Sequence, residues 1–343
     1  MLFETHPPLL GLHDVCLIPA PVTRVASRTE CDPYYSKGRL PLAAAPMDCV
    51  INETNWETFA KAGVLTVIPR TVPLKTRKHL MTSTFVGMSL NEFMQIFCTL
   101  NKSNDIAKVL EENDLQAKVC VDIANGHMQS LIDLCTIAKE IFGNRLILMT
   151  GNIANPMTYI LYAKAGIDYV RVGIGSGSRC TTSANVGVHF PMASLLDNIR
   201  RVQIATDMPT YPKIIADGGF SNYDDIIKAI ALGADFVMCG KFFAECEEAC
   251  GKVTVLPDGS REREYYGMST KVAQKKMGKS SLRTSEGISR TVKITHTLSQ
   301  KIENFKDYLT TAMSYCDSFN LIEFQSKAMV YKLSAEARQA YFK

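Results

Sequence analysis

The chain has 343 residues, a length that suggests two domains of about 150 residues each but that a single α/β barrel of ~250 residues with extensions fits equally well. Hydrophobic residues make up 46% and charged residues 21% of the sequence, which excludes a disordered, collagen-like or disulfide-rich miniprotein class. The net charge of +4 is too small to predict a nucleic-acid or membrane surface, so we expect a small-molecule ligand.

The cysteines and the start of the chain bear on the cellular compartment. Eleven cysteines are spread along the sequence without a Cys-x-x-Cys pair, so neither a disulfide framework nor a zinc site is predicted. The first ten residues contain Glu4, His6 and two prolines and lack the apolar stretch of a signal peptide. No 18 apolar residues run uninterrupted, so no transmembrane helix is predicted. We expect a protein of the reducing cytoplasm.

Short apolar runs rich in β-branched residues recur along the chain, each followed by helical spacing or by a polar loop that leads into a helix. Eight strands are predicted, at residues 42–47, 64–69, 83–86, 118–124, 146–150, 169–174, 214–216 and 236–239. Six helices are predicted between them, at residues 53–62, 90–100, 128–142, 156–165, 192–205 and 223–232.

Three of these helices end in the same way, with a glycine that can take the left-handed conformation just before the next strand: Gly63, Gly166 and Gly233. The repeated unit matches a parallel sheet, and eight strands favour a closed (β/α)₈ barrel. The strand at 83–86 carries the weakest signal. Without it, an open sheet of seven strands is the alternative.

No flexible linker marks a second domain, so residues 1–343 are expected to form a single (β/α)₈ TIM barrel. After the eighth strand, the turn signal Asp258-Gly259 predicts a polar hairpin within 251–266. We interpret residues 251–290 as a flap that serves the cofactor and residues 294–343 as a C-terminal extension.

In a parallel barrel, the loops that follow the strands build the active site. The loop after the sixth strand, residues 173–182, has three glycines at alternate positions and contains Cys180 beside Arg179. The exposed backbone N–H groups of such a loop can bind an anion, and its carbonyl oxygens can bind a cation. A nearby positive charge lowers the pKa of a thiol. Cys180 is therefore a candidate nucleophile, the alternative being a small buried hydrophobic residue.

The loops after the fourth, seventh and eighth strands add further candidates. Asp217-Gly218-Gly219 fits a ribose-binding carboxylate beside phosphate-binding amides, the alternative being a helix cap or turn aspartate. Gly240 and Lys241 offer more amides, and loops seven and eight of such barrels commonly share one phosphate. Asp122 and Asn125 add a carboxylate and an amide; to nearby His127 we assign no role.

These residues resemble the purine-nucleotide barrels that comprise IMP dehydrogenase and GMP reductase. The matching motifs run in the expected order over roughly residues 10–295: Leu-His-Asp-Val at 12–15, Ala-Pro-Met-Asp at 45–48, Gly-Ile-Gly-Ser-Gly-Ser-Arg-Cys-Thr-Thr at 173–182, Asp-Gly-Gly at 217–219, Ala-Asp-Phe-Val-Met-Cys-Gly at 234–240 and Tyr-Gly-Met-Ser at 266–269. The resemblance implies a covalent thioimidate between the loop cysteine and C2 of a purine 5′-monophosphate.

Within the family, dehydrogenases hydrolyse this adduct with water activated by an Arg-Tyr pair, whereas reductases expel ammonia from GMP and use NADPH. The 343 residues contain no Arg-Tyr dipeptide, and Arg-Thr-Ser-Glu-Gly at 283–287 resembles the reductase segment. Only residues 71–82 separate the second and third strands, where dehydrogenases usually carry a regulatory insert. The resemblance favours the reductase branch. The alternatives are a dehydrogenase without the insert and a catalytically silent nucleotide-binding barrel.

The resemblance also implies residue roles. Cys180 would be the nucleophile, and Thr182 with Glu286 would move the proton that ammonia needs. The implied substrate contacts are Asp217 for the ribose, the amides of Gly219, Gly240 and Lys241 with the Ser178 hydroxyl for the phosphate, Met268 and Ser269 for the base edge, and Asp122 and Asn125 near the reacting face. NADPH would meet Arg283, Arg70 and Ser269, and a monovalent cation such as K⁺ would bind carbonyls of Gly175, Gly177 and Cys180. A homotetramer is implied as well.

Three positions depart from the family pattern. Arg70 stands where the reductases usually have a lysine, which leaves its cofactor and proton role open. Lys241 replaces a second glycine of the phosphate loop, so its amide remains while the direction of its charge is open. Ser176 replaces a common proline, a change expected to be mild.

Overall fold

In the computed structural model, residues 8–177, 182–278, 281, 284 and 289–341 are described, with residues 100–104, 182 and 341 described by their backbone alone. Eight parallel strands form one sheet in the order β2-β9-β8-β7-β6-β5-β4-β3. The strands are β2 (Leu42–Ala44), β3 (Val67–Ile68), β4 (Phe85–Met88), β5 (Ala117–Asp122), β6 (Leu146–Ile153), β7 (Tyr169–Val172), β8 (Lys213–Asp217) and β9 (Phe236–Cys239).

The two end strands of this sheet meet and close it into a barrel. Ala43 of β2 forms a parallel bridge with Leu65, just before β3, and the Ala44 amide donates to the Leu65 carbonyl at 2.8 Å. The (β/α)₈ prediction is confirmed, and the open seven-stranded alternative is wrong because β4 pairs with both β3 and β5.

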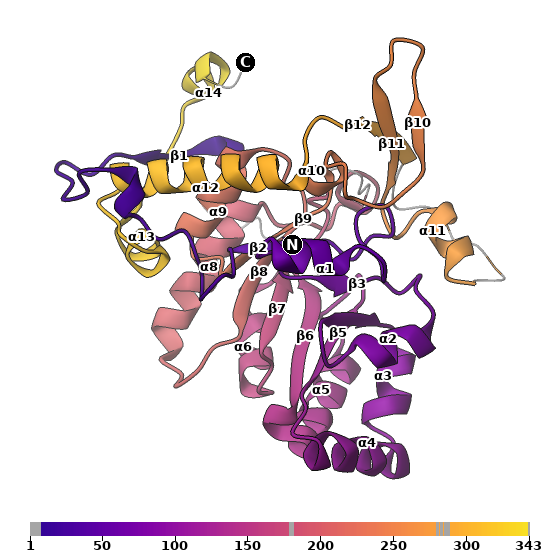
Figure 1. Cartoon of the computed structure of the whole chain (residues 1–343). Coiled ribbons are helices and arrows are strands. Elements are labelled where there is room, and N and C mark those ends of the chain that lie inside the picture. Colours follow the sequence, from indigo (N-terminus) through magenta and orange to yellow (C-terminus); the bar gives the residue numbers. More distant parts are fainter. Residues whose placement is uncertain (1–7, 178–181, 279–280, 282–283, 285–288, 342–343) are drawn as a thin grey trace.

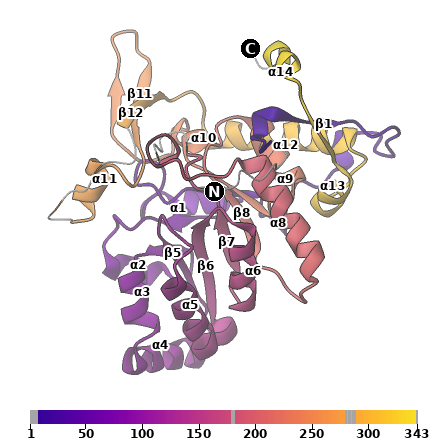
Figure 2. The ribbon, with the colours of Figure 1, turned by 180° about the vertical axis from the view of Figure 1, so that it is seen from behind.

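Helices surround the strands on the outside (Figures 1 and 2). They are α1 (Trp56–Lys61), α2 (Leu74–Leu80), α3 (Leu90–Phe97), α4 (Leu100–Glu112), α5 (Gln129–Phe142), α6 (Pro156–Lys164), α7 (Thr182–Val186), α8 (Met192–Thr206), α9 (Tyr223–Ala231) and α10 (Lys241–Ala244). All six predicted helices are present. Four of these helices were not predicted: α2 and α4, whose sequences are mostly polar, and the single-turn helices α7 and α10, which are too short to show a repeat.

Side chains that point into the barrel form an apolar floor. Because side chains alternate along a strand, every second residue faces the interior. The rings of Phe85 and Tyr169 lie 5.3 Å apart, those of Tyr169 and Phe236 lie 6.1 Å apart, and Tyr35 covers this end at 4.5 Å from Phe236. Two residues after Tyr169 on β7 lies Arg171, and two residues after Ile215 on β8 lies Asp217. Charged side chains therefore replace apolar ones at the carboxyl ends of the strands.

After β9 the chain leaves the barrel in a three-stranded antiparallel sheet that projects from it (Figure 1). It consists of β10 (Val253–Val255), β11 (Arg261–Tyr266) and β12 (Ser289–Lys293), with α11 (Lys271–Lys276) between the last two. The predicted hairpin is confirmed by the pairing of β10 with β11. It is not polar throughout, because Tyr265 and Tyr266 at the end of β11 are buried.

The C-terminal part packs on one side of the barrel, where α12 and α13 contact α9 (Figure 2). It contains α12 (Leu298–Tyr315), α13 (Leu321–Lys327), β13 (Met329–Lys332) and α14 (Ala335–Tyr341). Strand β13 pairs antiparallel with β1 (Val15–Ile18), so a segment near the start of the chain is joined to one near its end. In the part of the chain that the structure describes, no helix has the length and apolar character that crossing a membrane requires.

Candidate active site

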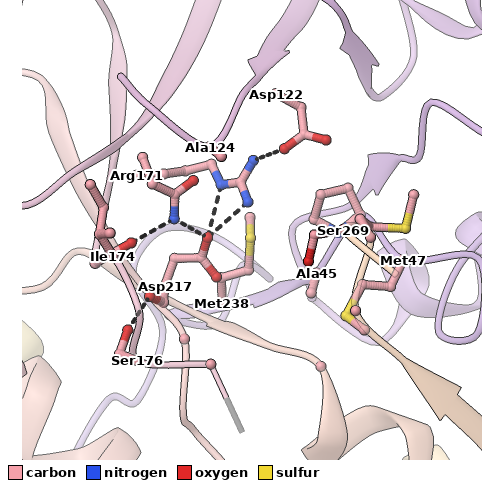
Figure 3. A pocket seen from close by; sticks show the side chains of 18 of the residues that line it. Ala45, Met47, Asp122, Ala124, Arg171, Ile174, Ser176, Asp217, Met238 and Ser269 are labelled. Carbon is pink, nitrogen blue, oxygen red and sulfur yellow. Dashed lines mark hydrogen bonds and ion pairs between the residues drawn. The ribbon is translucent and has the colours of Figure 1, made fainter. Parts of the chain in front are cut away.

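A cavity of about 600 Å³ opens at the carboxyl ends of the barrel strands, where the strand-end loops meet the segment after β11 (Figure 3). Most of the predicted site residues that the structure describes line it: Arg70, Asp122, Gly175, Gly177, Asp217, Gly219, Gly240, Lys241, Met268 and Ser269. The sequence motifs from six separate loops therefore converge on one space.

Asn125 is not among the cavity residues. Its side chain is exposed, and its Oδ1 accepts a hydrogen bond from the His127 amide at 3.1 Å within the loop after β5. His127 Nε2 accepts from the Ala154 amide at 3.0 Å, and Nδ1 lies 2.9 Å from the Thr158 hydroxyl. Burial lowers the pKa of His127. This neutral histidine ties the loop after β5 to the loop after β6, and the turn that it stabilises leaves Asn125 at the surface.

Four predicted residues, Ser178, Cys180, Arg283 and Glu286, lie outside the described residues, as does the side chain of Thr182. The backbone of Thr182 begins α7. Gly177 and Thr284, the nearest described residues before Cys180 and Glu286, both line the cavity.

Arg171 joins the two carboxylates of the cavity wall (Figure 3). Its Nη1 lies 2.5 Å from Asp122 Oδ1, and its Nη2 and Nε lie 2.8 and 3.1 Å from Asp217 Oδ2. Asn152 Nδ2 donates to the same Asp217 oxygen at 2.7 Å, and Arg70 Nε donates to Asp122 Oδ2 at 3.2 Å. The network brings two positive and two negative charges together, and its arginine fork matches carboxylate geometry.

The position of Arg171 follows from its strand. It faces the barrel interior two residues after Tyr169, and its register partner on β6 is Gly151. A Cβ on Gly151 would lie 2.7 Å from the Cβ of Arg171, so only a glycine leaves room for the long side chain. Neither Arg171 nor Asn152 was predicted as a site residue. The signal for Arg171 was present, because it is a charged residue inside an otherwise apolar strand.

The network keeps its members charged. Burial opposes ionisation of Asp122, but the guanidinium groups of Arg171 and Arg70 outweigh burial and hold the pKa of Asp122 below its ordinary value. Burial likewise opposes the charge on Arg171, and the carboxylates of Asp217 and Asp122 raise its pKa well above the ordinary value. The wall is therefore polar but close to electrically neutral.

The glycine loops after β7 and β8 are packed against each other. A Cβ on Gly218 would lie 2.5 Å from Ser176 Oγ, and one on Gly219 would lie 2.6 Å from the Ser176 carbonyl; both glycines have positive φ. The Ser176 hydroxyl donates to the Asp217 carbonyl at 3.2 Å. Ser176, in the place of the family's usual proline, thus links the loop that leads to Cys180 with the loop that carries Asp217.

Backbone donors face the cavity beside this contact. Among the described residues, the N–H groups of Gly219, Gly240 and Lys241 have no protein acceptor. A Cβ on Gly240 would lie 2.6 Å from the Tyr265 hydroxyl oxygen, so a larger residue here would displace the Tyr265 side chain. Unpaired N–H groups at strand-end loops form an anion-binding surface.

The roof of the cavity, residues 265–277, is fixed to the barrel by a cluster of three side chains. Asp48 Oδ2 accepts from the Tyr266 hydroxyl at 2.9 Å and from Lys276 Nζ at 2.8 Å, and Lys276 Nζ also donates to the Tyr266 oxygen at 2.6 Å. Burial is the main cause that raises the pKa of Tyr266 to about 12. Burial opposes the charge on Lys276, but its bonds to Asp48 and Tyr266 raise its pKa. Met268 and Ser269 lie between these contacts and line the cavity.

Comparisons with known proteins agree with this geometry. The sequence matches the family model described as IMP dehydrogenase / GMP reductase domain over residues 10–340. The inosine-5′-monophosphate dehydrogenase of Chlorobaculum parvum is 34% identical over 255 residues, which cover 70% of this chain and 50% of the relative. The GMP reductase of Pediococcus pentosaceus is 32% identical over 270 residues, 75% of this chain and 77% of the relative.

The GMP reductase of Shewanella pealeana is 27% identical over 357 residues, which cover 97% of both chains. By contrast, the chain spans only about half the length of the dehydrogenases that it matches. Because the family model covers residues 10–340, the protein belongs to the IMP dehydrogenase / GMP reductase family, whose members are oxidoreductases acting on purine nucleotides.

Proposed function

We propose that the protein is a GMP reductase, which converts GMP to IMP and ammonia with NADPH as the reductant. The observation that carries the proposal is the segment after the roof. The sequence has no Arg-Tyr dipeptide to activate a hydrolytic water, and instead carries Glu286 in a reductase-like segment at 283–287. In addition, only the short helix α2 lies between β3 and β4, and several similar proteins are named GMP reductase.

The proposed reaction has two steps. The Cys180 thiolate bonds to C2 of GMP, and the bond from C2 to the amino nitrogen breaks. Because an amide ion is a poor leaving group, Thr182 and Glu286 supply the proton with which the nitrogen leaves as ammonia, an effect worth roughly 10²–10⁴ in rate. C2 would then accept a hydride, which is the chemistry that NADPH would supply when bound beside Arg70, Ser269 and Arg283. The bond from carbon to sulfur then breaks, which releases IMP and restores the thiolate.

The described residues suit the binding part of this reaction. Three donors already occupy Asp217 Oδ2, which leaves Oδ1 to accept hydrogen bonds from the ribose hydroxyls. The amides of Gly219, Gly240 and Lys241 would bind the phosphate. Met268 and Ser269 would hold the base edge, and Asp122 would lie near the reacting face. We propose no substrate contact for Asn125, because its side chain is at the surface.

The cofactor and a cation belong to the same proposal. Arg70 lines the cavity, and its side chain is 23% exposed. The guanidinium N–H groups that do not bond to Asp122 are therefore open to NADPH, and Ser269 and Arg283 would be further contacts. Gly175 and Gly177 both line the cavity, and their carbonyl oxygens, with that of Cys180, are suitable ligands for K⁺. The proposal takes the chain as one barrel domain with residues 251–290 as a flap and 294–343 as an extension, acting in the cytoplasm as a homotetramer.

The direct test is to incubate the protein with GMP and NADPH and to follow the absorbance of the reduced cofactor. We expect NADPH oxidation with release of ammonia and IMP. Formation of NADH from IMP and NAD, without NADPH oxidation by GMP, would assign the dehydrogenase reaction instead.

Cys180→Ala is expected to abolish turnover while GMP binding persists, because the phosphate and ribose contacts are separate from the thiol. Turnover at the wild-type rate in this variant would exclude the covalent step.

A further inference from the structure

The charges around the cavity are unevenly balanced. Five charged residues line it in the described part of the chain: Arg70, Asp122, Arg171, Asp217 and Lys241. The first four pair with one another in the wall network. Lys241 lies apart from them, beside Gly240, and brings one positive charge without a negative charge from the cavity lining.

The acidic neighbour of Lys241 is bound by another lysine. Lys241 Nζ lies 3.7 Å from Glu245 Oε1, beyond hydrogen-bond length. Lys301 Nζ contacts Glu245 Oε2 at 2.7 Å and is buried, with its side chain only 5% exposed. Lys301 also lies 4.7 Å from the ring of Phe242. A buried ammonium depends on its carboxylate partner, so Glu245 is committed to Lys301 and neutralises only one of the two lysines.

The Lys241 ammonium, which shares Glu245 with Lys301, belongs to the same part of the cavity lining as the unpaired amides. The N–H group of Lys241 belongs to the same residue as its ammonium, and the N–H groups of Gly240 and Gly219 face the same cavity. A phosphate monoester carries a charge of about −1.5 to −2 at neutral pH, which amide dipoles alone do not balance. The Lys241 side chain is 36% exposed, and its flexible stem lets the ammonium turn from Glu245 toward such a group.

We propose that the Lys241 ammonium binds the 5′-phosphate of the substrate directly and makes the site select purine nucleotides over nucleosides by charge. This inference rests on the proposed function in one respect, that the ligand is a purine 5′-mononucleotide. It applies equally to GMP and IMP, because the two share the 5′-phosphate. It assigns a binding role to the side chain at a position where the family pattern has glycine.

The test compares Lys241→Met with Lys241→Arg and with Lys164→Met, which removes a charge from the exposed face of α6. Binding of GMP, IMP, guanosine and inosine to the full chain is measured by calorimetry at low and high salt. In Lys241→Met we expect affinity for both nucleotides to fall by about tenfold at low salt, and by less at high salt because ions screen an exposed charge. Nucleoside affinity and the thermal midpoint stay unchanged. Lys241→Arg retains nucleotide binding, and Lys164→Met resembles the wild type.

The outcomes separate the two proposals. If the wild type binds GMP and IMP and Lys241→Met binds both with wild-type affinity, the Lys241 inference is wrong while the proposed function stands. Equal losses for nucleotides and nucleosides, or a lowered thermal midpoint, would also overturn it, because they indicate a structural role. If the wild type binds neither nucleotide, the proposed function fails and the inference fails with it.

Discussion

The wall and the roof border the same cavity, but different kinds of contact hold them in place. The wall consists of strand-end side chains, and Arg171 and Asp122 are both buried. Asp217 lies on β8, which pairs with the strand of Arg171, whereas Asp122 lies on β5, two strands from Arg171 across β6; the register of these strands fixes the distances. The roof, residues 265–277, depends on the cluster of Asp48, Tyr266 and Lys276, in which the lysine side chain is 52% exposed.

The two regions are therefore expected to differ in how much they contribute to stability. A buried charge that loses its partner has no water to replace it, so damage to the wall destabilises the whole fold. An exposed ion pair contributes little to stability, but here it holds a segment that covers the ligand. We therefore expect wall substitutions to lower the free energy of unfolding in addition to any effect on the proposed substrate contacts, and roof substitutions to raise the KM with little change in stability.

Arg171→Met is the strongest test of the wall. It leaves the buried Asp122 and the half-buried Asp217 without the guanidinium that joins them. We expect the free energy of unfolding to fall by about 3–5 kcal/mol, the usual cost of removing one member of a buried ion pair. Urea denaturation measures this loss. Arg171→Lys keeps one positive charge without the fork and is expected to lose less; a loss below about 1 kcal/mol in the methionine variant would contradict the wall argument.

Asp122→Asn has a smaller effect that depends on pH. The pKa of Asp122 is lower in the folded chain, where Arg171 and Arg70 outweigh burial, than in the unfolded chain. Its carboxylate therefore stabilises the fold above the unfolded value of about 3.9, and this contribution is lost as the pH falls through the folded value. Denaturation at pH 7 and at about pH 3.5 should show a stability difference between wild type and variant that shrinks in acid. A constant difference would show that Asp122 does not act through its charge.

The sequence allowed much of the wall to be predicted, because strand periodicity and strand-end motifs are local. Asp217-Gly218-Gly219 directly follows an apolar strand, and the barrel topology then brings it to the cavity. The predicted strand at 83–86 lies two residues later, as β4 (Phe85–Met88). Such a shift is expected where a short apolar run has no sharp boundary signal.

Pairwise contacts were harder to predict. Arg171 bonds to residues 49 and 46 positions away, and no local pattern indicates which carboxylates it joins. Asn125 shows the reverse case: nearness to Asp122 in the sequence predicted a shared site, whereas its side chain is exposed and is not part of the cavity lining. The roof cluster joins Asp48 to Lys276, 228 residues apart, and the sequence held no sign of that contact.

Lys276→Met tests the roof with the smallest expected change in stability. The substitution removes the bonds from Lys276 Nζ to Asp48 and Tyr266. Since this ammonium is half-exposed, the free energy of unfolding should fall by less than about 1 kcal/mol. The KM for the nucleotide should rise several-fold, because residues 267–277 lose one of the contacts that hold them over the cavity. Lys275→Met is the matched control, since Lys275 is the exposed neighbour on the same helix. An equal rise in KM for both variants would indicate that the loss of net charge, and not of the Asp48 contact, is responsible. An unchanged KM in Lys276→Met would show that the roof is held independently of this cluster.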